Sequence, residues 1–150
     1  MRLALFQPDI PQNVGACIRL GACFGVPLDV IEPVGFAFDD RAMKRAALDY
    51  GPLGHMTRHR DWDSFIHDRP GGRLILFTTK GATSLDRFEF QPGDTLLFGK
   101  ETAGAPDHVH AAADARVVIP IRAETRSLNL SVSAAIALWE ALRQTGTAIG

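Results

Sequence analysis

Three small polar residues, Ser127, Asn129 and Ser131, alternate with Leu128 and Leu130 at the start of the most apolar helical segment of the chain. Ser and Asn are preferred N-cap residues because their side chains accept hydrogen bonds from the free backbone N–H groups of a helix start. One cap needs one such residue, and this segment has three. The segment is therefore a candidate ligand site as well as a helix cap.

Two other segments are rich in the same small polar types: "TTKG", from Thr78 to Gly81, and "GKETAGAP", from Gly99 to Pro106. Each follows an apolar run of strand length, and "PIRAETRSLNLS", which ends at Ser131, follows a third. In open sheets of parallel strands, ligands bind outside the carboxyl ends of the strands. One such segment is typical of an ordinary turn, but three of one composition indicate a binding site.

The elements that must position these segments alternate between strands and helices, which predicts an α/β fold with a mainly parallel sheet flanked by helices. The apolar runs are continuous, as is typical of strands covered on both faces. Strands are expected at Leu3–Phe6, Leu28–Pro33, Leu74–Gly81, Thr95–Glu101 and Arg116–Ile121. Helices are expected at Asn13–Gly25, at Asp39–Asp49, after the cap signal of Asp61, from Pro106 as the first helical residue, and at Ser131–Gln144.

Composition bounds the class of protein. The 150 residues are 46% hydrophobic and 22% charged, which predicts one globular domain spanning 1–150. A net charge of −1 excludes a grossly basic nucleic-acid binder but leaves local patches open. No membrane-spanning run or signal-peptide pattern occurs, so the protein is expected to be cytoplasmic. Cys17 and Cys23 form no C-x-x-C pair, and both are expected to be reduced packing residues.

Several common sites are excluded by their spacing. "QPDIPQNVG" after the first strand lacks the G-x-G-x-x-G of dinucleotide-binding folds. "GDTLLFGKE" has one residue too many for a P-loop, and no G-x-S-x-G elbow occurs. His108 and His110 have no acidic or Cys partners at familiar ligand spacing, so no metal site is expected. Like the other histidines, His55, His59 and His67, they are expected on the surface.

Three motifs, in order along the chain, resemble those of the SPOUT superfamily of RNA methyltransferases. They are "NVGACIR" (Asn13–Arg19), "FGKETAG" (Phe98–Gly104) and "IPIRAETRSLNLSVSAAIALWEAL" (Ile119–Leu142). They match the SpoU/TrmH branch, which methylates ribose 2′-hydroxyls. The short length and "IEPVGFAFDDRAMKRAALDYG" (Ile31–Gly51) are similar to members that act on the wobble nucleotide of tRNA.

The resemblance implies a deep C-terminal trefoil knot, which forms a pocket for S-adenosyl-L-methionine (AdoMet). The reaction it implies is methyl transfer to the ribose 2′-hydroxyl of tRNA nucleotide 34, a cytidine or modified uridine, with S-adenosyl-L-homocysteine as product. Leucine tRNAs are the expected isoacceptors, bound through the anticodon stem-loop. A ribosomal RNA 2′-O-methyltransferase and a non-catalytic RNA-binding relative remain alternatives.

The resemblance also assigns site residues. The catalytic set is Arg19, Asn13, Glu101, Ser127 and Asn129, and the cofactor set is Phe77, Thr78, Thr79, Gly99, Ile119, Ile121, Ser127 and Leu128. Arg19 could instead be a surface arginine, and Asn13 could be only a helix cap. Because Arg is normally always protonated, a role in positioning the phosphate and hydroxyl is favoured over a role as general base.

No separate RNA-binding domain is expected, so the candidate RNA contacts are basic residues of the catalytic domain. They are Arg41, Lys44 and Arg45, Arg58 and Arg60 with His59 between them, and Arg122 and Arg126. The alternative for each group is a solvated charged face. The last helix carries two apolar stripes, which are Val132, Ala135, Ile136, Trp139 and Leu142, and Ala134, Leu138 and Ala141. The family resemblance favours a homodimer packed through this helix and the first one; a monomer with a fully buried helix is the alternative.

Overall fold

Seven parallel strands form one sheet in the order β3-β2-β1-β6-β4-β7-β5. The computed structural model describes residues 1–38, 41, 45, 55–80 and 83–147. The strands are β1 (Arg2–Phe6), β2 (Leu28–Ile31), β3 (Met56–His59), β4 (Leu74–Phe77), β5 (Thr83–Ser84), β6 (Thr95–Phe98) and β7 (Ala115–Val118). The predicted α/β class and the parallel sheet are confirmed.

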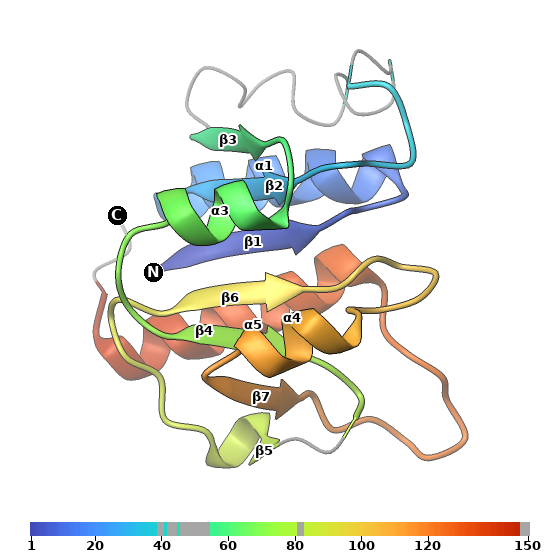
Figure 1. Ribbon diagram of the computed structural model, residues 1–150. Coiled ribbons are helices and arrows are strands. Elements are labelled where there is room, and N and C mark those ends of the chain that lie inside the picture. The colour runs from blue at the N-terminus through green and yellow to red at the C-terminus, as the bar shows by residue number, and fades with distance from the viewer. Residues whose placement is uncertain (39–40, 42–44, 46–54, 81–82, 148–150) are drawn as a thin grey trace.

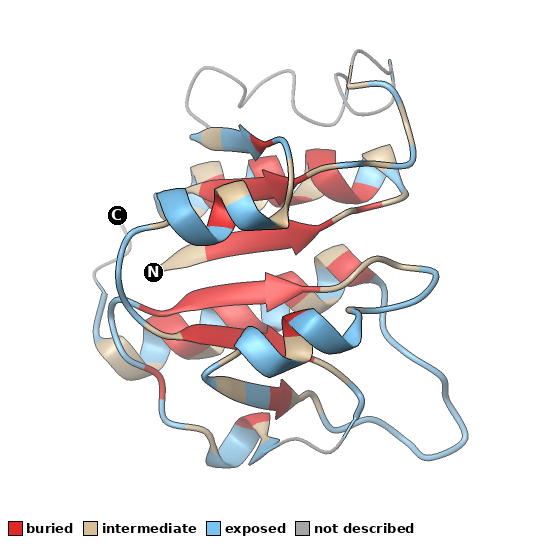
Figure 2. Cartoon of the chain, viewed as in Figure 1, coloured by how far each residue is buried: buried red, intermediate tan, exposed pale blue. Residues whose placement is uncertain are grey.

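Helices cover both faces of the sheet (Figure 1). The helices α1 (Pro11–Phe24) and α5 (Leu130–Thr145) pack on one face, and α3 (Trp62–Asp68) and α4 (Asp107–Ala112) pack on the other. Buried residues form one apolar cluster on each side of the strands. The central strands are buried along nearly their whole length, as continuous apolar runs predict (Figure 2).

The five predicted strands all occur, but four of them end earlier than expected. The ladder stops at Ile31, Phe77, Phe98 and Val118, before the polar segments begin. Two strands were missed. In β3, Thr57 and Arg58 are exposed and His59 is buried, so the segment has no apolar run, and β5 is only two residues long. Both lie at the edges of the sheet, where one side of a strand needs no partner.

Four of the five predicted helices are confirmed, and three of these begin at other residues than expected. The cap of α1 is Ile10, without a side-chain hydrogen bond, so the prediction that Asn13 caps this helix is wrong. Pro106 is the N-cap of α4 rather than its first helical residue. For α3 the prediction holds, because Asp61 accepts a 2.8 Å hydrogen bond from the backbone N–H of Ser64. The predicted helix at Asp39–Asp49 lies outside the described residues, except for Arg41 and Arg45.

The two cysteines differ in environment. Burial raises the pKa of the Cys17 thiol to about 12, with a smaller contribution from the charge of Glu101. Cys17 is therefore a protonated core residue, as expected. Cys23 is exposed on α1, so its assignment as a packing residue is wrong.

Phe65 anchors α3 to the sheet, and its neighbour Ile66 points outward. Phe65 is fully buried against the rings of His59 and Trp62, whereas Ile66 is exposed. Phe65→Ala should lower the free energy of unfolding by about 3–5 kcal/mol, because it removes a buried ring and leaves a cavity. Ile66→Ala should change it by about 0.5 kcal/mol or less. Urea unfolding of both variants tests the packing, and equal losses would contradict it.

Candidate functional site

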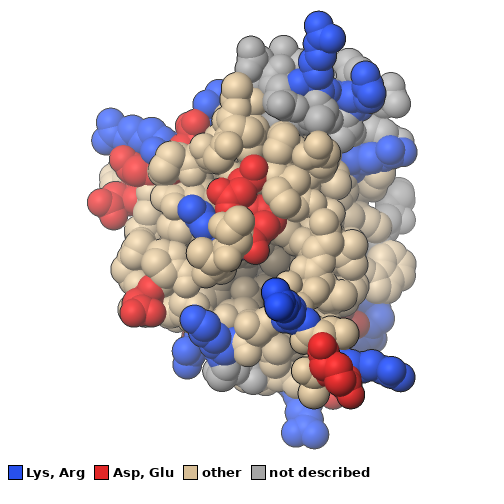
Figure 3. Space-filling view, turned by 90° about the vertical axis from the view of Figure 1, so that its right-hand side faces the viewer, with Lys and Arg blue, Asp and Glu red and all other residues tan. Residues whose placement is uncertain are grey.

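A cavity of about 480 Å³ opens at the carboxyl ends of the neighbouring strands β6, β4 and β7. The three polar segments named from the sequence form its walls, together with the start of α1. Figure 3 views the molecule from this edge and shows a hollow near the middle of the face, with acidic and basic side chains around it. The sequence predicted a binding site at these strand ends, and a cavity lies there; that it binds a ligand stays a prediction.

The cavity brings the predicted cofactor contacts together. All of them line it: Phe77, Thr78, Thr79, Gly99, Ile119, Ile121, Ser127 and Leu128. Four of the five predicted catalytic residues also line it, namely Asn13, Glu101, Ser127 and Asn129. Their contacts with a ligand remain predictions, but their convergence from four segments is a property of the fold.

Sequence reasoning missed part of the lining. Lys80 and Lys100 stand next to predicted residues and add positive charge at the wall. His110, expected on the surface of a helix, is half-buried and lines the cavity from α4. The sequence gives no signal that His110 faces the cavity. Because α4 is only six residues long, its packing on the sheet alone decides which of its sides faces the cavity.

A buried amide connects the walls of the cavity. Asn13 is 4% exposed in the first turn of α1, where its Nδ2 donates to Glu101 Oε1 at 3.1 Å. Its Oδ1 accepts from Asn129 Nδ2 at 3.0 Å. Asn13 therefore joins the loop after β6 to the start of α5, and its role is tertiary rather than that of a helix cap.

Glu101 and Asn129 complete this network at the two helix starts. Glu101 also accepts hydrogen bonds from the backbone N–H groups of Asp9 and Ile10, at 2.7 and 3.2 Å. A carboxylate there is favoured by the positive end of the helix dipole. Asn129 Oδ1 accepts from the backbone N–H groups of Ser131 and Val132, so Asn129 is the N-cap of α5. Asn129 therefore caps α5 and also lines the cavity, and its catalytic role stays a prediction.

Gly99 is required by a close approach of two backbones. A Cβ at this position would lie 2.4 Å from the backbone of Gly104 and of Ala105. Gly104 has φ +68° with open space around it, so its glycine serves the turn itself. A larger side chain at Gly99 would therefore displace the loop that forms the cavity wall before it filled the cavity.

Arg19 lies apart from the other predicted catalytic residues. It is exposed on α1 and is not among the residues that line the cavity. It stands six residues after Asn13, which is about 9 Å along a helix and on a different side of it. Within one chain, the fold does not bring the Arg19 side chain to the cavity.

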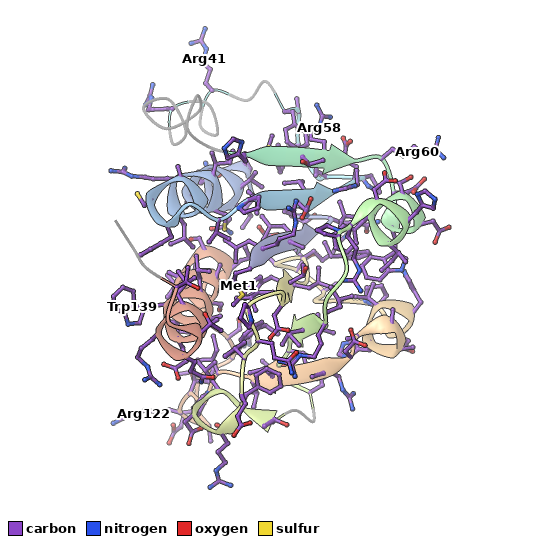
Figure 4. The ribbon with its side chains drawn as sticks, turned by 90° about the vertical axis from the view of Figure 1, so that its left-hand side faces the viewer. Met1, Arg41, Arg58, Arg60, Arg122 and Trp139 are labelled. Atoms are coloured by element: carbon purple, nitrogen blue, oxygen red, sulfur yellow. The ribbon has the colours of Figure 1, made fainter. Side chains whose placement is uncertain are left out.

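The predicted RNA contacts divide between opposite edges of the sheet. Arg58 lies on the edge strand β3, with Arg60 just after it, whereas Arg122 follows β7 at the other edge (Figure 4). Arg126 is exposed in the same segment as Arg122. Arg41 and Arg45 are exposed, and Lys44 lies outside the described residues.

His59 departs from its prediction. It is 6% exposed, and its Nε2 lies 2.8 Å from Asp29 Oδ1. Its ring packs against Phe65 of α3, on the face of the sheet that α3 covers. The expectation that His59 is a surface residue is wrong, and so is its grouping with Arg58 and Arg60 as an exposed RNA contact. The reason is strand alternation, since His59 points to the face opposite from Arg58.

One face of α5 is apolar and exposed. Ala134, Leu138 and Ala141 are buried on the sheet, as expected for one stripe, and Leu142 of the other stripe is buried with them. Ala135 is half-buried, and the three large residues of that stripe are exposed: Val132 is 45%, Ile136 39% and Trp139 55% exposed. Trp139 projects from the helix in Figure 4 and contacts the ring of Phe24 of α1. The alternative of a fully buried helix in a monomer is therefore wrong.

The described residues contain no group of three or more His, Cys, Asp or Glu side chains that could hold a metal ion. Among the same residues, no helix is long and apolar enough to cross a membrane.

Comparisons with known proteins agree with the geometry. Residues 1–139 match the SpoU rRNA Methylase family. The chain is 51% identical over 146 residues to the tRNA (cytidine(34)-2′-O)-methyltransferase of Beijerinckia indica, covering 96% of this chain and 91% of that protein. A structure solved for insight into the 2-OH methylation of C/U34 on tRNA superimposes with a TM-score of 0.91 at 41% identity, covering 95% and 94% of the two chains.

A more distant structure shares the same fold. The AdoMet-bound rRNA methyltransferase of Sinorhizobium meliloti has a TM-score of 0.85 at 25% identity, and the match covers 95% of this chain but 55% of that one. Motif order, cavity position and both kinds of comparison agree. The chain belongs to the SpoU methylase family of the SPOUT RNA methyltransferases.

Proposed function

We propose that this protein transfers a methyl group from AdoMet to the ribose 2′-hydroxyl of nucleotide 34 of tRNA, within the anticodon stem-loop. The observation that carries the proposal is the single cavity at the strand ends, where all the expected cofactor residues and four expected catalytic residues meet. Relatives that match nearly the full chain support the substrate, because they are tRNA (cytidine(34)-2′-O)-methyltransferases. Leucine tRNAs, by resemblance, are the expected isoacceptors, and the expected location is the cytoplasm.

The cavity fits AdoMet in size and lining. Its volume of about 480 Å³ lies within the range of about 300–1,000 Å³ typical of small-molecule sites. Ile119, Ile121 and Leu128 provide apolar walls for an adenine, and the polar strand ends offer backbone hydrogen-bonding groups. The close backbone crossing at Gly99 shapes the wall between β6 and the following loop. When bound, AdoMet supplies an electrophilic methyl group.

The polar network positions the site rather than removing the proton. Glu101 accepts three hydrogen bonds from Asp9, Ile10 and Asn13, which engage its lone pairs and fix its orientation. A carboxylate held in this way is a poor general base. Glu101, Asn13 and Asn129 therefore act as positioning residues, and Ser127, exposed on the cavity wall, is left to contact the ligand directly.

We further propose a homodimer packed through α1 and α5. The support is the exposed apolar stripe of Val132, Ile136 and Trp139, because a soluble chain gains by covering such a surface. Arg19 lies on the exposed side of α1, outside the cavity of its own chain. A partner seated on these two helices would bring Arg19 close to a nucleotide bound at the partner's cavity. The trefoil knot is characteristic of the SPOUT fold and stays a prediction for this chain.

The first test is methylation of RNA. The wild-type protein with labelled AdoMet should methylate nucleotide 34 of an anticodon stem-loop, and Arg19→Ala should lose about 10²–10³-fold in single-turnover rate, since a charge-stabilising group at the reacting centre is removed. The affinity of Arg19→Ala for AdoMet should stay near that of the wild type. Arg19→Lys should recover little, because Lys lacks the planar fork that grips a phosphate at two points.

The control is Arg116→Ala, which removes an exposed arginine on β7 and should leave the rate unchanged. Near wild-type turnover in Arg19→Ala would contradict its catalytic role. Nucleoside mapping that finds the label in ribosomal RNA, and none in tRNA, would replace the proposed substrate. Absence of methylation together with absence of AdoMet binding would indicate a non-catalytic relative.

The second test concerns the cofactor cavity. Gly99→Ala places a methyl group 2.4 Å from the backbone of Gly104 and Ala105, so the loop must move and AdoMet affinity should fall by tenfold or more, about 1.4 kcal/mol. Gly104→Ala is the matched control. Its Cβ meets open space, so it should retain affinity despite the strain at φ +68°. Calorimetric titration with AdoMet measures the affinity of both variants. Unimpaired binding by Gly99→Ala would show that the close approach at Gly99 is not needed for the AdoMet site.

The third test concerns the dimer. Trp139→Glu should yield a folded monomer, because a buried, unpaired charge at the subunit contact costs about 3–5 kcal/mol. Ile66→Glu, on α3 at the other face of the sheet, is the matched control and should remain dimeric. Sedimentation measures both. A Trp139→Glu protein that sediments as the same dimer as the wild type would place the subunit contact elsewhere.

A further inference from the structure

A second cavity, here called the α3 cavity, lies beneath α3 and β3 and takes no part in the methyl-transfer site. Its volume is about 630 Å³, and its lining includes four arginines: Arg2, Arg58, Arg60 and Arg69. Two carboxylates, Asp29 and Asp68, line it as well. Arg2, Arg58 and Arg60 each form an ion pair with a carboxylate, and Arg69 donates to a backbone carbonyl, so the surroundings of the cavity are densely charged but close to neutral.

The floor of the α3 cavity is a buried ion cluster. The side chain of Asp29 is 2% exposed and lies between Arg2 and His59. Arg2 donates to it from Nε at 2.8 Å and from Nη2 at 3.0 Å, and His59 Nε2 lies 2.8 Å from Oδ1. Because both partners satisfy this carboxylate, its charge is neutralised and the Arg2 guanidinium is held in a fixed orientation.

The rim of the cavity keeps hydrogen-bond donors available for a ligand. Arg60 Nε donates to Ser64 Oγ and lies 3.3 Å from Asp61 Oδ2, and Arg69 Nη1 donates to the carbonyl of Gly72. The guanidinium of Arg58 points to the other face of β3, where it stacks on Phe38 and donates to Glu32 Oε1. A guanidinium carries five N–H donors, and each of these bonds engages one. The hydroxyls of Thr57 and Ser64 add further polar atoms to the same wall.

We infer that the α3 cavity binds a phosphate group of the RNA backbone and holds the stem of the substrate while its loop reaches the methyl-transfer cavity. This inference rests on the proposed function. Guanidinium groups bind phosphate oxygens at two points. The lining is polar, which suits a phosphate group and does not suit an apolar segment of a partner protein.

The position of the cavity agrees with such a contact. Across the sheet, β3 is separated from β6, at the methyl-transfer cavity, by two strands, which is about 14 Å at the usual strand spacing. The α3 cavity also reaches Arg2 at the amino end of β1, whereas the methyl-transfer cavity lies at the carboxyl ends of its strands, so about 14 Å is the smallest separation of the two cavities. That distance corresponds to about four phosphate steps of roughly 3.4 Å along one strand of a double helix. One short stem can therefore touch both cavities. Figure 4 shows Arg58 and Arg60 at this edge of the molecule, and Arg122 at the opposite one.

The test removes two rim arginines together. The Arg60→Ala/Arg69→Ala variant should bind an anticodon stem-loop about tenfold more weakly than the wild type, with KM for RNA raised and kcat unchanged. The slope of log affinity against log salt should become shallower by about 1–2, since each lost phosphate contact contributes about 0.7–0.9. The control is Arg87→Ala, an exposed arginine after β5 at the other edge of the sheet, which should change neither quantity.

Fluorescence anisotropy measures RNA affinity, and steady-state methylation measures KM and kcat. Unchanged RNA affinity and salt slope in the double variant would overturn the inference, even when methylation by the wild type confirms the proposed function. A second arm titrates the wild type and the double variant with inorganic phosphate. Tight phosphate binding that the double variant loses, without any change in RNA affinity, would assign the cavity to a free anion and also overturn the RNA contact. If the wild type methylates no RNA, the proposed function fails, whatever the anisotropy shows.

Discussion

The hydrogen bonds of the Asn13 amide are the interaction on which the site depends. Through Nδ2 to Glu101 and Oδ1 to Asn129, one buried side chain connects three segments that are up to 116 residues apart in the sequence. Glu101 and Asn129 in turn satisfy the backbone N–H groups at the starts of α1 and α5. A buried amide without these partners would cost free energy, so the three segments can close only in the arrangement that satisfies it.

The sheet makes this arrangement possible. Because all the strands are parallel, their polar carboxyl-terminal segments emerge at one edge, where the cavity forms between β6, β4 and β7. The apolar runs stop where they meet this edge, and the residues after Phe77, Phe98 and Val118 are free to turn away from the ladder. The loop after β6 can pass close to its own strand only because Gly99 has no Cβ.

The surfaces outside the cavity carry two different kinds of contact. The exposed stripe of α5 is apolar, as the proposed dimer requires, whereas the α3 cavity is lined by arginines and other polar groups, as the proposed phosphate contact requires. The two lie on opposite faces of the sheet, since α5 and α3 cover different sides. A subunit contact and an RNA contact can therefore be occupied at the same time.

The sequence by itself determined the α/β class, five strands, and the types of residue at the strand ends, because hydrophobic periodicity and capping preferences are local properties. All the residues that the family resemblance predicted as cofactor contacts line the cavity. Tertiary structure alone decided the rest. Asn13 became a link between segments instead of a cap, His59 turned inward to Asp29, and Arg19 lies outside the cavity of its own chain. Each of these outcomes depends on which distant segment packs beside the residue. A local sequence pattern does not determine that long-range contact.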